Sequence, residues 1–270
     1  MCSVLVTLGA DGSRTPVDVL FPVRHTASNE HMHTLERELR LARDLDVGEL
    51  ADAIESIGFE CTRCGACCKG YEDEDGMEPH TATTFPDEAR TLQRATGYDW
   101  RDVVRPMPYG LSNGADGLEG STFEWALAVD DCGDCTFYAE DDDGIGSCRV
   151  HQDRPLVCRT YPFSVVLADE GDEESPAGSA SGTVGGTSQP LGEAVDRVGP
   201  VRAHECEGLG REIDEDEARE LAEALKTRAI RELEEAIAVR EHYRSVRPAD
   251  GEIVVHDSEG AKRPDGRLIE

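Results

Sequence analysis

The chain has 270 residues, which is enough for one large domain or two small ones. Its 57 acidic residues outnumber its 27 basic residues, and the net charge of −30 argues against a nucleic-acid partner, because phosphates require a basic surface. No run of about 18 apolar residues and no signal peptide is visible, so we expect a cytoplasmic protein that does not enter a membrane.

The basic residues include only three lysines, Lys69, Lys226 and Lys262, and the others are arginine. An acidic surface with so little lysine resembles that of proteins from salt-loving archaea. In concentrated salt the repulsion between these charges would be screened, since the Debye length falls to about 3 Å at 1 M. The charge therefore indicates the solvent rather than a binding function.

Residues 1–31 differ from the rest of the chain and are expected to be an N-terminal extension. Two short apolar stretches around the turn G-A-D-G can be read as strands, or the segment can precede a natural start at Met32. Cys2 lies here, far from the other cysteines. A helical pattern follows Met32, with apolar residues three and four apart at Leu35, Leu39, Ala42 and Leu45. We expect the main domain to occupy residues 32–244 and a tail to occupy residues 245–270.

A second helix is predicted to begin after Asp46, which has capping-box spacing with Glu49, and to end at Gly58. Its apolar positions are Leu50, Ala51, Ile54 and Ile57. This helix leads directly into a cysteine-rich segment, so we interpret it as scaffold.

That segment is C-T-R-C-G-A-C-C-K-G, residues 61–70, and it contains Cys61, Cys64, Cys67 and Cys68. Thiolates at C-x2-C spacing can converge on one soft ion, because a turn brings the second sulfur beside the first. The first three cysteines match the start of a bacterial ferredoxin loop, but Tyr71 replaces the fourth, so a further ligand must come from elsewhere. Adjacent residues point about 100° apart on a helix, and the pair Cys67–Cys68 therefore favours two neighbouring centres or one larger cluster.

Further elements are predicted after this segment. A helix should begin at Pro86, bury Leu92 and Ala95 and end at Gly97. A short helix capped by Asp99, a non-helical turn and a strand over residues 122–129 follow. The next cysteines are Cys132 and Cys135 at C-x2-C spacing, then Cys148, and then Cys158 on a short helix that Pro155 starts.

The last part of the chain is predicted to begin with a strand over residues 164–168. Its stretch V-V-L-A-D can pair with A-V-D-R-V across the loop 169–190, which is rich in Gly, Ser and acidic residues and is expected to be disordered. Cys206 follows in a turn that Gly208 and Gly210 permit. Asp214 and Glu217 form a second capping box before a helix that extends to about Tyr243. The tail can form a hairpin or dock as a loop.

All ten cysteines except Cys2 lie between residues 61 and 206. Eight thiolates suffice for two four-coordinate zinc sites or for iron–sulfur clusters. Such centres carry negative charge that nearby donors or cations can offset, and the candidates are Arg63, Lys69, Arg149, Arg154 and Arg159. Competing ligands are His80, His151 and His204, although each of these is more often a surface or hydrogen-bonded histidine.

These motifs resemble those of the CxxCxxCC family of YkgJ-like proteins, described as a zinc- or iron-chelating domain. The resemblance rests on residues 61–70, on the stretch around R-P-L-V-C-R-T-Y-P-F and on the final C-E-G-L-G. It implies that the metal ligands are Cys61, Cys64, Cys67, Cys68, Cys135, Cys148, Cys158 and Cys206, whereas Cys132 fits the pattern less clearly. The first cysteine cluster is also similar to that of flagellin lysine-N-methylases, but no Gly-rich loop after a strand is present to bind a methyl donor.

Together these patterns predict an α+β fold: a small, irregular, cysteine-rich domain centred on metal, with flanking helices and a few short antiparallel strands. The first hypothesis is a protein that holds an iron–sulfur cluster, for electron transfer or redox sensing, or zinc, as an adaptor or chelator. The alternative is an enzyme, either an iron–sulfur oxidoreductase or a methyl-transfer enzyme. A polar pocket beside the metal, lined by groups such as Asp153, Arg154 and Tyr161, would favour the enzyme, and a closed site would favour structural zinc.

Overall fold

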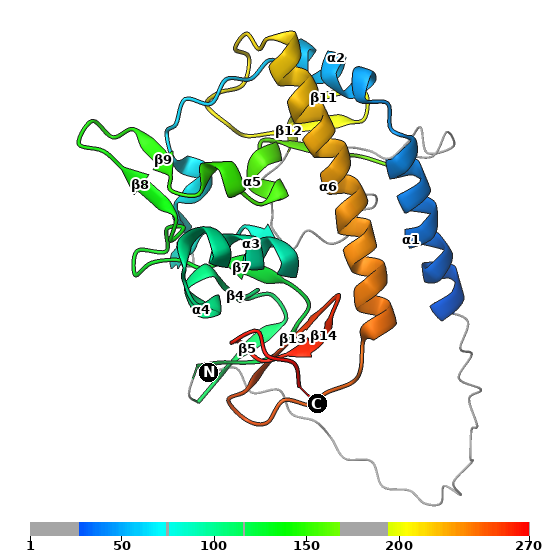
Figure 1. The fold of residues 1–270 in the computed structure, drawn as a ribbon, viewed down its shortest axis with the longest axis vertical. Coiled ribbons are helices and arrows are strands. Elements are labelled where there is room, and N and C mark those ends of the chain that lie inside the picture. Colours follow the sequence, from blue (N-terminus) through cyan, green and yellow to red (C-terminus); the bar gives the residue numbers. More distant parts are fainter. Residues whose placement is uncertain (1–26, 74–75, 116, 168–193, 270) are drawn as a thin grey trace, which may run out of the picture.

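The computed structural model describes residues 27–73, 76–115, 117–167 and 194–269. In these residues helices and short sheets are combined in an α+β fold, as predicted (Figure 1). The two strands expected within residues 1–31 and the loop 169–190 lie outside the described residues.

Long helices occupy both ends of the described chain, and shorter ones lie between them. They are α1 (Ala27–Asp44), α2 (Val47–Ile57), α3 (Pro86–Thr96), α4 (Trp100–Val103), α5 (Leu156–Thr160) and α6 (Glu215–His242), with the 3-10 helices η1 (Ala66–Cys68) and η2 (His151–Asp153). Two of the predicted caps are confirmed by side-chain hydrogen bonds, whereas Asp99 lies at the N-cap of α4 but its side chain makes no capping hydrogen bond. Asp46 accepts a hydrogen bond of 3.0 Å from the amide of Glu49, and Asp214 accepts one of 2.8 Å from the amide of Glu217.

The strands are short and form several small sheets. They are β1 (Tyr71–Asp73), β2 (Gly76–Glu78), β3 (Thr83–Thr84), β4 (Val104–Pro106), β5 (Leu111–Gly114), β6 (Gly117–Thr122), β7 (Trp125–Leu127), β8 (Tyr138–Glu140), β9 (Gly146–Cys148), β10 (Phe163–Val165), β11 (Ala194–Val198), β12 (Val201–His204), β13 (Ile253–Asp257) and β14 (Gly260–Lys262). The sheet orders are β1-β2, β3-β7-β4, β14-β13-β6-β5, β8-β9 and β10-β12-β11. The pairing of β13 with β6 is parallel, and the others are antiparallel.

Two hydrophobic cores form among the described residues. In the first, α1, α2 and α6 pack on the sheet β10-β12-β11, with Leu50, Ile54, Phe163, Leu225 and Leu233 buried between them (Figure 1). The second joins α3, α4 and the strands around Trp125, and its buried residues include Leu92, Val103, Phe137 and Val255. Three cysteines, Cys68, Cys148 and Cys158, pack against this second core, and Cys135 is buried within it.

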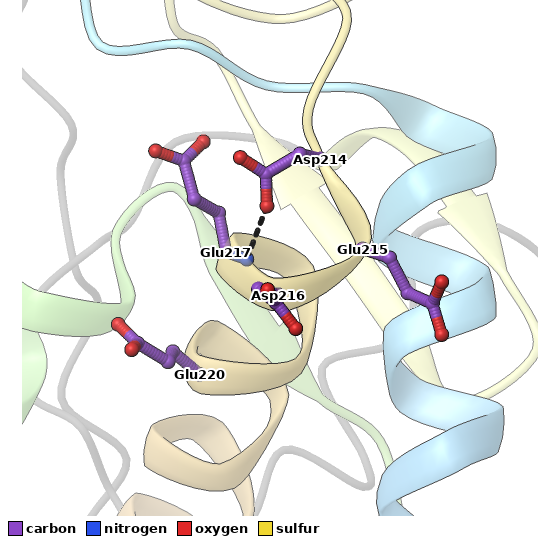
Figure 2. Close-up of a pocket in the computed structure, with 5 residues that line it drawn as sticks. All are labelled: Asp214, Glu215, Asp216, Glu217 and Glu220. Carbon is purple, nitrogen blue, oxygen red and sulfur yellow. Dashed lines mark hydrogen bonds between the residues drawn. The ribbon is translucent and has the colours of Figure 1, made fainter.

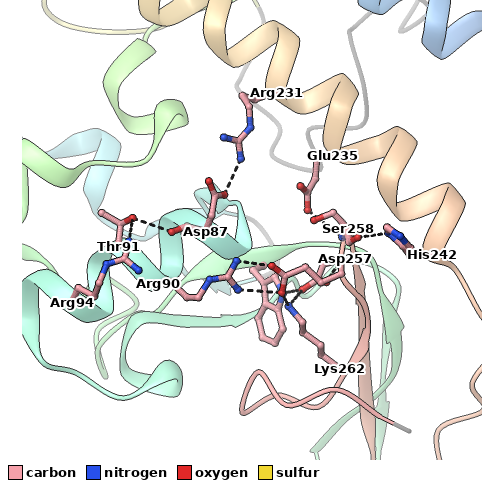
Figure 3. Close-up of polar contacts among 12 residues, drawn as sticks. Asp87, Arg90, Thr91, Arg94, Arg231, Glu235, His242, Asp257, Ser258 and Lys262 are labelled. Atoms are coloured by element: carbon pink, nitrogen blue, oxygen red, sulfur yellow. Dashed lines mark hydrogen bonds and ion pairs between the residues drawn. The ribbon is translucent and has the colours of Figure 1, made fainter.

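The C-terminal residues form the hairpin β13–β14, which polar contacts fix to α3 and α6 (Figure 3). Asp257 Oδ2 accepts hydrogen bonds from Trp125 Nε1 and Lys262 Nζ, both at 2.8 Å. Glu259 binds Lys262 at 2.6 Å and Arg90 at 2.5 and 3.1 Å. The tail is therefore an integral part of the second core.

Three local predictions need correction. Ala95 is exposed, and Ala89 is buried beside Leu92 instead. The strand expected over 122–129 is interrupted, because β6 ends at Thr122 and β7 begins at Trp125. The strands β10 and β11 do not pair; β12 lies between them, because the tight turn at Gly199 joins β11 directly to β12.

Candidate metal centre

The chain leaves α2 at Gly58 and immediately pairs with the segment that contains Cys206. Phe59 and Leu209 form an isolated antiparallel bridge, and the Glu60 amide donates to the Gly208 carbonyl at 3.0 Å. A Cβ on Gly208 would lie 2.3 Å from the Glu60 oxygen, so this close approach requires glycine. The predicted turn at Gly208 is thus confirmed, and it brings Cys206 beside the start of the segment Cys61–Cys68.

Two left-handed residues then bend the cysteine segment. Arg63 has φ 58° and Gly65 has φ 80°. The Cys68 amide donates to the Gly65 carbonyl at 2.8 Å, which closes the turn of η1. The Sγ atoms of Cys67 and Cys68 lie 3.8 Å apart.

The second half of the segment is fixed to the region of Cys135 and Cys148. The Cys135 amide donates to the Cys68 carbonyl at 2.8 Å, and the Gly70 amide donates to Asp134 Oδ1 at 2.9 Å. Cys148 lies opposite Tyr138 in the hairpin β8–β9. These two hydrogen bonds place Cys68 beside Cys135, although the two residues are far apart in the sequence.

Cys158 lies on α5, as predicted, and two residues that the sequence did not single out hold that helix. Glu88 Oε1 accepts a hydrogen bond of 2.8 Å from the Leu156 amide, at the start of α5. The buried Arg228 of α6 donates to Thr160 Oγ1 at 3.0 Å, at its end. Both contacts join distant parts of the chain, so no local pattern could have revealed them.

The pKa values of the thiols reflect burial and mutual proximity. The hydrogen bond with Cys68 raises the pKa of Cys67 well above its usual range, while Arg154 opposes this shift. Burial raises the pKa of Cys135 to about 11 and that of Cys158 well above its usual value, and neighbouring thiolates add to both shifts. Burial also raises the pKa of Cys206, with smaller contributions from Cys67, Cys64 and Cys61.

Some cysteine sulfurs are near backbone amides that favour a thiolate. The Gly208 amide donates to Cys206 Sγ at 3.5 Å, and the amides of Phe137 and Tyr138 lower the pKa of Cys135 by hydrogen bonding. Cys132, in contrast, is exposed on the turn before Cys135.

Of the cations predicted to offset thiolate charge, Arg154 acts on Cys67, as its effect on the pKa shows. Lys69 instead pairs with the carboxylate of Glu140 and lies 5.3 Å from the centre of the Tyr138 ring. Tyr138 donates to the same carboxylate at 2.6 Å. Tyr138 and Glu140 carried no motif in the sequence, because their role depends on the fold.

The three histidines considered as alternative metal ligands differ in their surroundings. His204 Nε2 and Ser164 Oγ are hydrogen-bonded at 2.8 Å. His151 is exposed. His80 is buried, and burial lowers its pKa to about 4, so its imidazole is neutral near pH 7.

The donor type at this centre fits zinc or an iron–sulfur cluster, both of which bind thiolates. Within the described residues, no three His, Cys, Asp or Glu side chains are placed closely enough to hold a metal ion as they stand. Ligation of one ion by three or more thiols therefore requires cysteine side chains to turn toward a common point.

One pocket lies away from the cysteines, around the first turn of α6 (Figure 2). Its lining is entirely acidic and consists of Asp214, Glu215, Asp216, Glu217 and Glu220. It does not include Asp153, Arg154 or Tyr161. The Tyr161 hydroxyl donates to the Glu205 carbonyl at 2.5 Å.

The fold and these residues define a cysteine-rich α+β domain with a thiol set suited to metal chelation. Residues 60–181 match the model of the CxxCxxCC family, described as "Putative zinc- or iron-chelating domain". The match includes the cysteines from Cys61 to Cys158 and ends before Cys206. Comparisons with curated proteins and with solved structures gave no match. In the described part of the chain, no helix has the length and apolar character needed to cross a membrane.

Proposed function

We propose that this protein binds zinc or an iron–sulfur cluster through cysteine thiolates. The proposed ligands are Cys61, Cys64, Cys67, Cys68, Cys135, Cys148, Cys158 and Cys206. The observation that carries the proposal is the convergence of distant segments on the cysteine segment: the Cys135 amide binds the Cys68 carbonyl, and Cys206 lies two residues before Gly208, which pairs with Glu60.

Packing alone is a weaker explanation for this convergence. A cysteine that only fills a core is buried, but Cys61 and Cys67 are exposed and Cys64, Cys148 and Cys206 are partly exposed. Backbone amides also donate hydrogen bonds to Cys135 and Cys206. Such bonds stabilise a thiolate ligand more than a neutral thiol that only fills a core. Bound zinc would hold these loops together, and a bound cluster would supply one-electron chemistry.

The test is elemental analysis and an absorption spectrum of protein purified without oxygen. We expect either about two zinc ions per chain and no visible colour, or iron with sulfide and broad visible absorption. Cys64→Ser should lower the metal content and the melting temperature. Cys132→Ser is the matched control, because Cys132 is exposed on a turn and should leave both unchanged.

Two results would contradict the proposal. One is a wild-type protein that contains neither zinc nor iron and takes up neither when they are supplied. The other is a Cys64→Ser protein that keeps its full metal content and thermal stability.

A further inference from the structure

We infer that the eight cysteines form two adjacent four-thiolate centres, with the boundary between Cys67 and Cys68. The first centre consists of Cys61, Cys64, Cys67 and Cys206, and the second of Cys68, Cys135, Cys148 and Cys158. This inference rests on the proposed metal-binding function. It also assigns a role to Cys206, which lies outside the residues that match the CxxCxxCC family.

The first centre is located beside the first hydrophobic core. Phe59 and Leu209, whose bridge aligns the two segments, both pack against that core. The Gly210 amide donates to the Gly58 carbonyl at 3.0 Å, which extends the pairing beyond the bridge. Cys206 is therefore held next to the residues that precede Cys61, because Glu60, whose amide binds the Gly208 carbonyl, comes directly before Cys61.

The second centre is located at the second core. Cys68 is partly buried and packs there with Cys148 and Cys158, while Cys135 is 6% exposed. The bond from the Cys135 amide to the Cys68 carbonyl fixes these two residues directly. Tyr138, which lies opposite Cys148 in the hairpin β8–β9, donates its amide to the Cys135 carbonyl at 2.8 Å, so Cys135 and Cys148 are also held close together.

The vicinal pair connects the centres. Cys67 is exposed and Cys68 packs on the second core, so the two side chains have different surroundings although their sulfurs are 3.8 Å apart. Cys67 is thus the residue at which the two centres divide. We assign it to the first centre because residues Cys61, Cys64 and Cys67 form one C-x2-C-x2-C loop whose missing fourth ligand Cys206 supplies.

This division makes a quantitative prediction about pairs of substitutions. Two serines in the same centre should remove one zinc ion, and two serines in different centres should remove both. The test pairs are Cys68→Ser with Cys158→Ser, and Cys68→Ser with Cys206→Ser. Reduced full-length protein would be freed of metal, titrated with zinc chloride and counted by native mass spectrometry, with Cys132→Ser as control.

We expect about two zinc ions in the wild type and the control, about one in the same-centre pair and none in the cross-centre pair. If the wild type contains iron, iron and sulfide should fall by half and to zero in the same two variants. Cys206→Ser alone should halve the metal content. Circular dichroism would verify folding, and Cys148→Ser replaces Cys158→Ser if that helix variant does not fold.

Other outcomes overturn the inference while leaving the proposed function intact. A single substitution that removes all the metal would mean one larger cluster. Full metal content in Cys206→Ser would remove Cys206 from the ligands. A wild type that binds neither metal would instead contradict the proposed function itself.

Discussion

Gly65 shows how a single residue shapes the cysteine segment. Its backbone is left-handed, with φ 80° and ψ −6°, and it lies against the Tyr138 side chain. A Cβ at this position would be 2.2 Å from the Tyr138 hydroxyl. Glycine is therefore needed here both for the backbone conformation and for space.

Gly65→Ala should be more destabilising than Gly97→Ala. Gly97 has nearly the same backbone conformation, with φ 74° and ψ 12°, but nothing within 4 Å of its Cβ position. Both variants should lose about 1 kcal/mol from backbone strain. Gly65→Ala should lose about 1–3 kcal/mol more by displacing Tyr138. Denaturant unfolding would measure the difference, and metal content should fall only in Gly65→Ala. Equal losses in the two variants would show that the contact with Tyr138 is unimportant.

At the scale of single residues, the sequence indicates candidate metal ligands better than it indicates the residues that hold them in place. Cys61, Cys64 and Cys67 could be singled out as candidates because C-x2-C spacing brings sulfurs together within a turn, whereas Cys148, Cys158 and Cys206 were candidates only by family resemblance. Tyr138, Glu88 and Arg228 could not, because each acts on a residue that is close only in the folded chain. Lys69 illustrates the same limit: its position after Cys68 suggested a partner for thiolates, but Glu140 is its partner.

Among the elements, those set by local chemistry were predicted well. Asp46 and Asp214 cap their helices because an aspartate oxygen reaches an amide three residues later. Strand partners were less predictable. The pairing expected between residues 165–169 and 194–198 is wrong, since β12 follows β11 after one tight turn and occupies the place beside it.

The hairpin β13–β14 depends on an ion-pair group that should be sensitive to acid. The hydrogen bond from Arg90, followed by Lys262, lowers the pKa of Glu259 from 4.5 to about 2. Between these two values the unfolded chain binds more protons than the folded chain. Glu259 therefore stabilises the fold fully above about pH 4.5, and this contribution is lost as the pH falls toward 2.

Glu259→Gln should consequently reduce the free energy of unfolding at pH 6, and the difference from wild type should shrink between pH 4.5 and pH 3. Denaturant unfolding at several pH values would measure it. Glu234→Gln is the control, because Glu234 also binds an arginine, Arg43, at 2.9 Å, but this exposed pair lacks a second, buried cation such as the Lys262 that binds Glu259. A difference for Glu259→Gln that is constant with pH would mean that its carboxylate charge is not what stabilises the hairpin.

At the scale of the whole molecule, charge is the dominant feature. The net charge is −30, and among the described residues five acidic side chains line the pocket at the start of α6 (Figure 2). In the hairpin β13–β14, the ion pairs Arg90–Glu259 and Lys262–Asp257 offset part of the repulsion between acidic side chains. Most of the excess acidic groups have no such cation, because the chain has 30 more acidic than basic residues.

The melting temperature of the protein should therefore rise with salt concentration, and most steeply at low salt. Repulsion between acidic groups favours the unfolded chain, and the Debye length falls from about 10 Å at 0.1 M to about 3 Å at 1 M. Screening that recovers about 2–3 kcal/mol would raise the melting temperature by about 5–10 °C. Thermal unfolding in KCl, at equal metal content in every sample, should show the steepest rise below about 0.5 M and little change above 1 M. A melting temperature that climbs linearly to 3 M would indicate exclusion of salt from the protein surface instead. One that does not rise would mean that the folded chain tolerates its charge without screening.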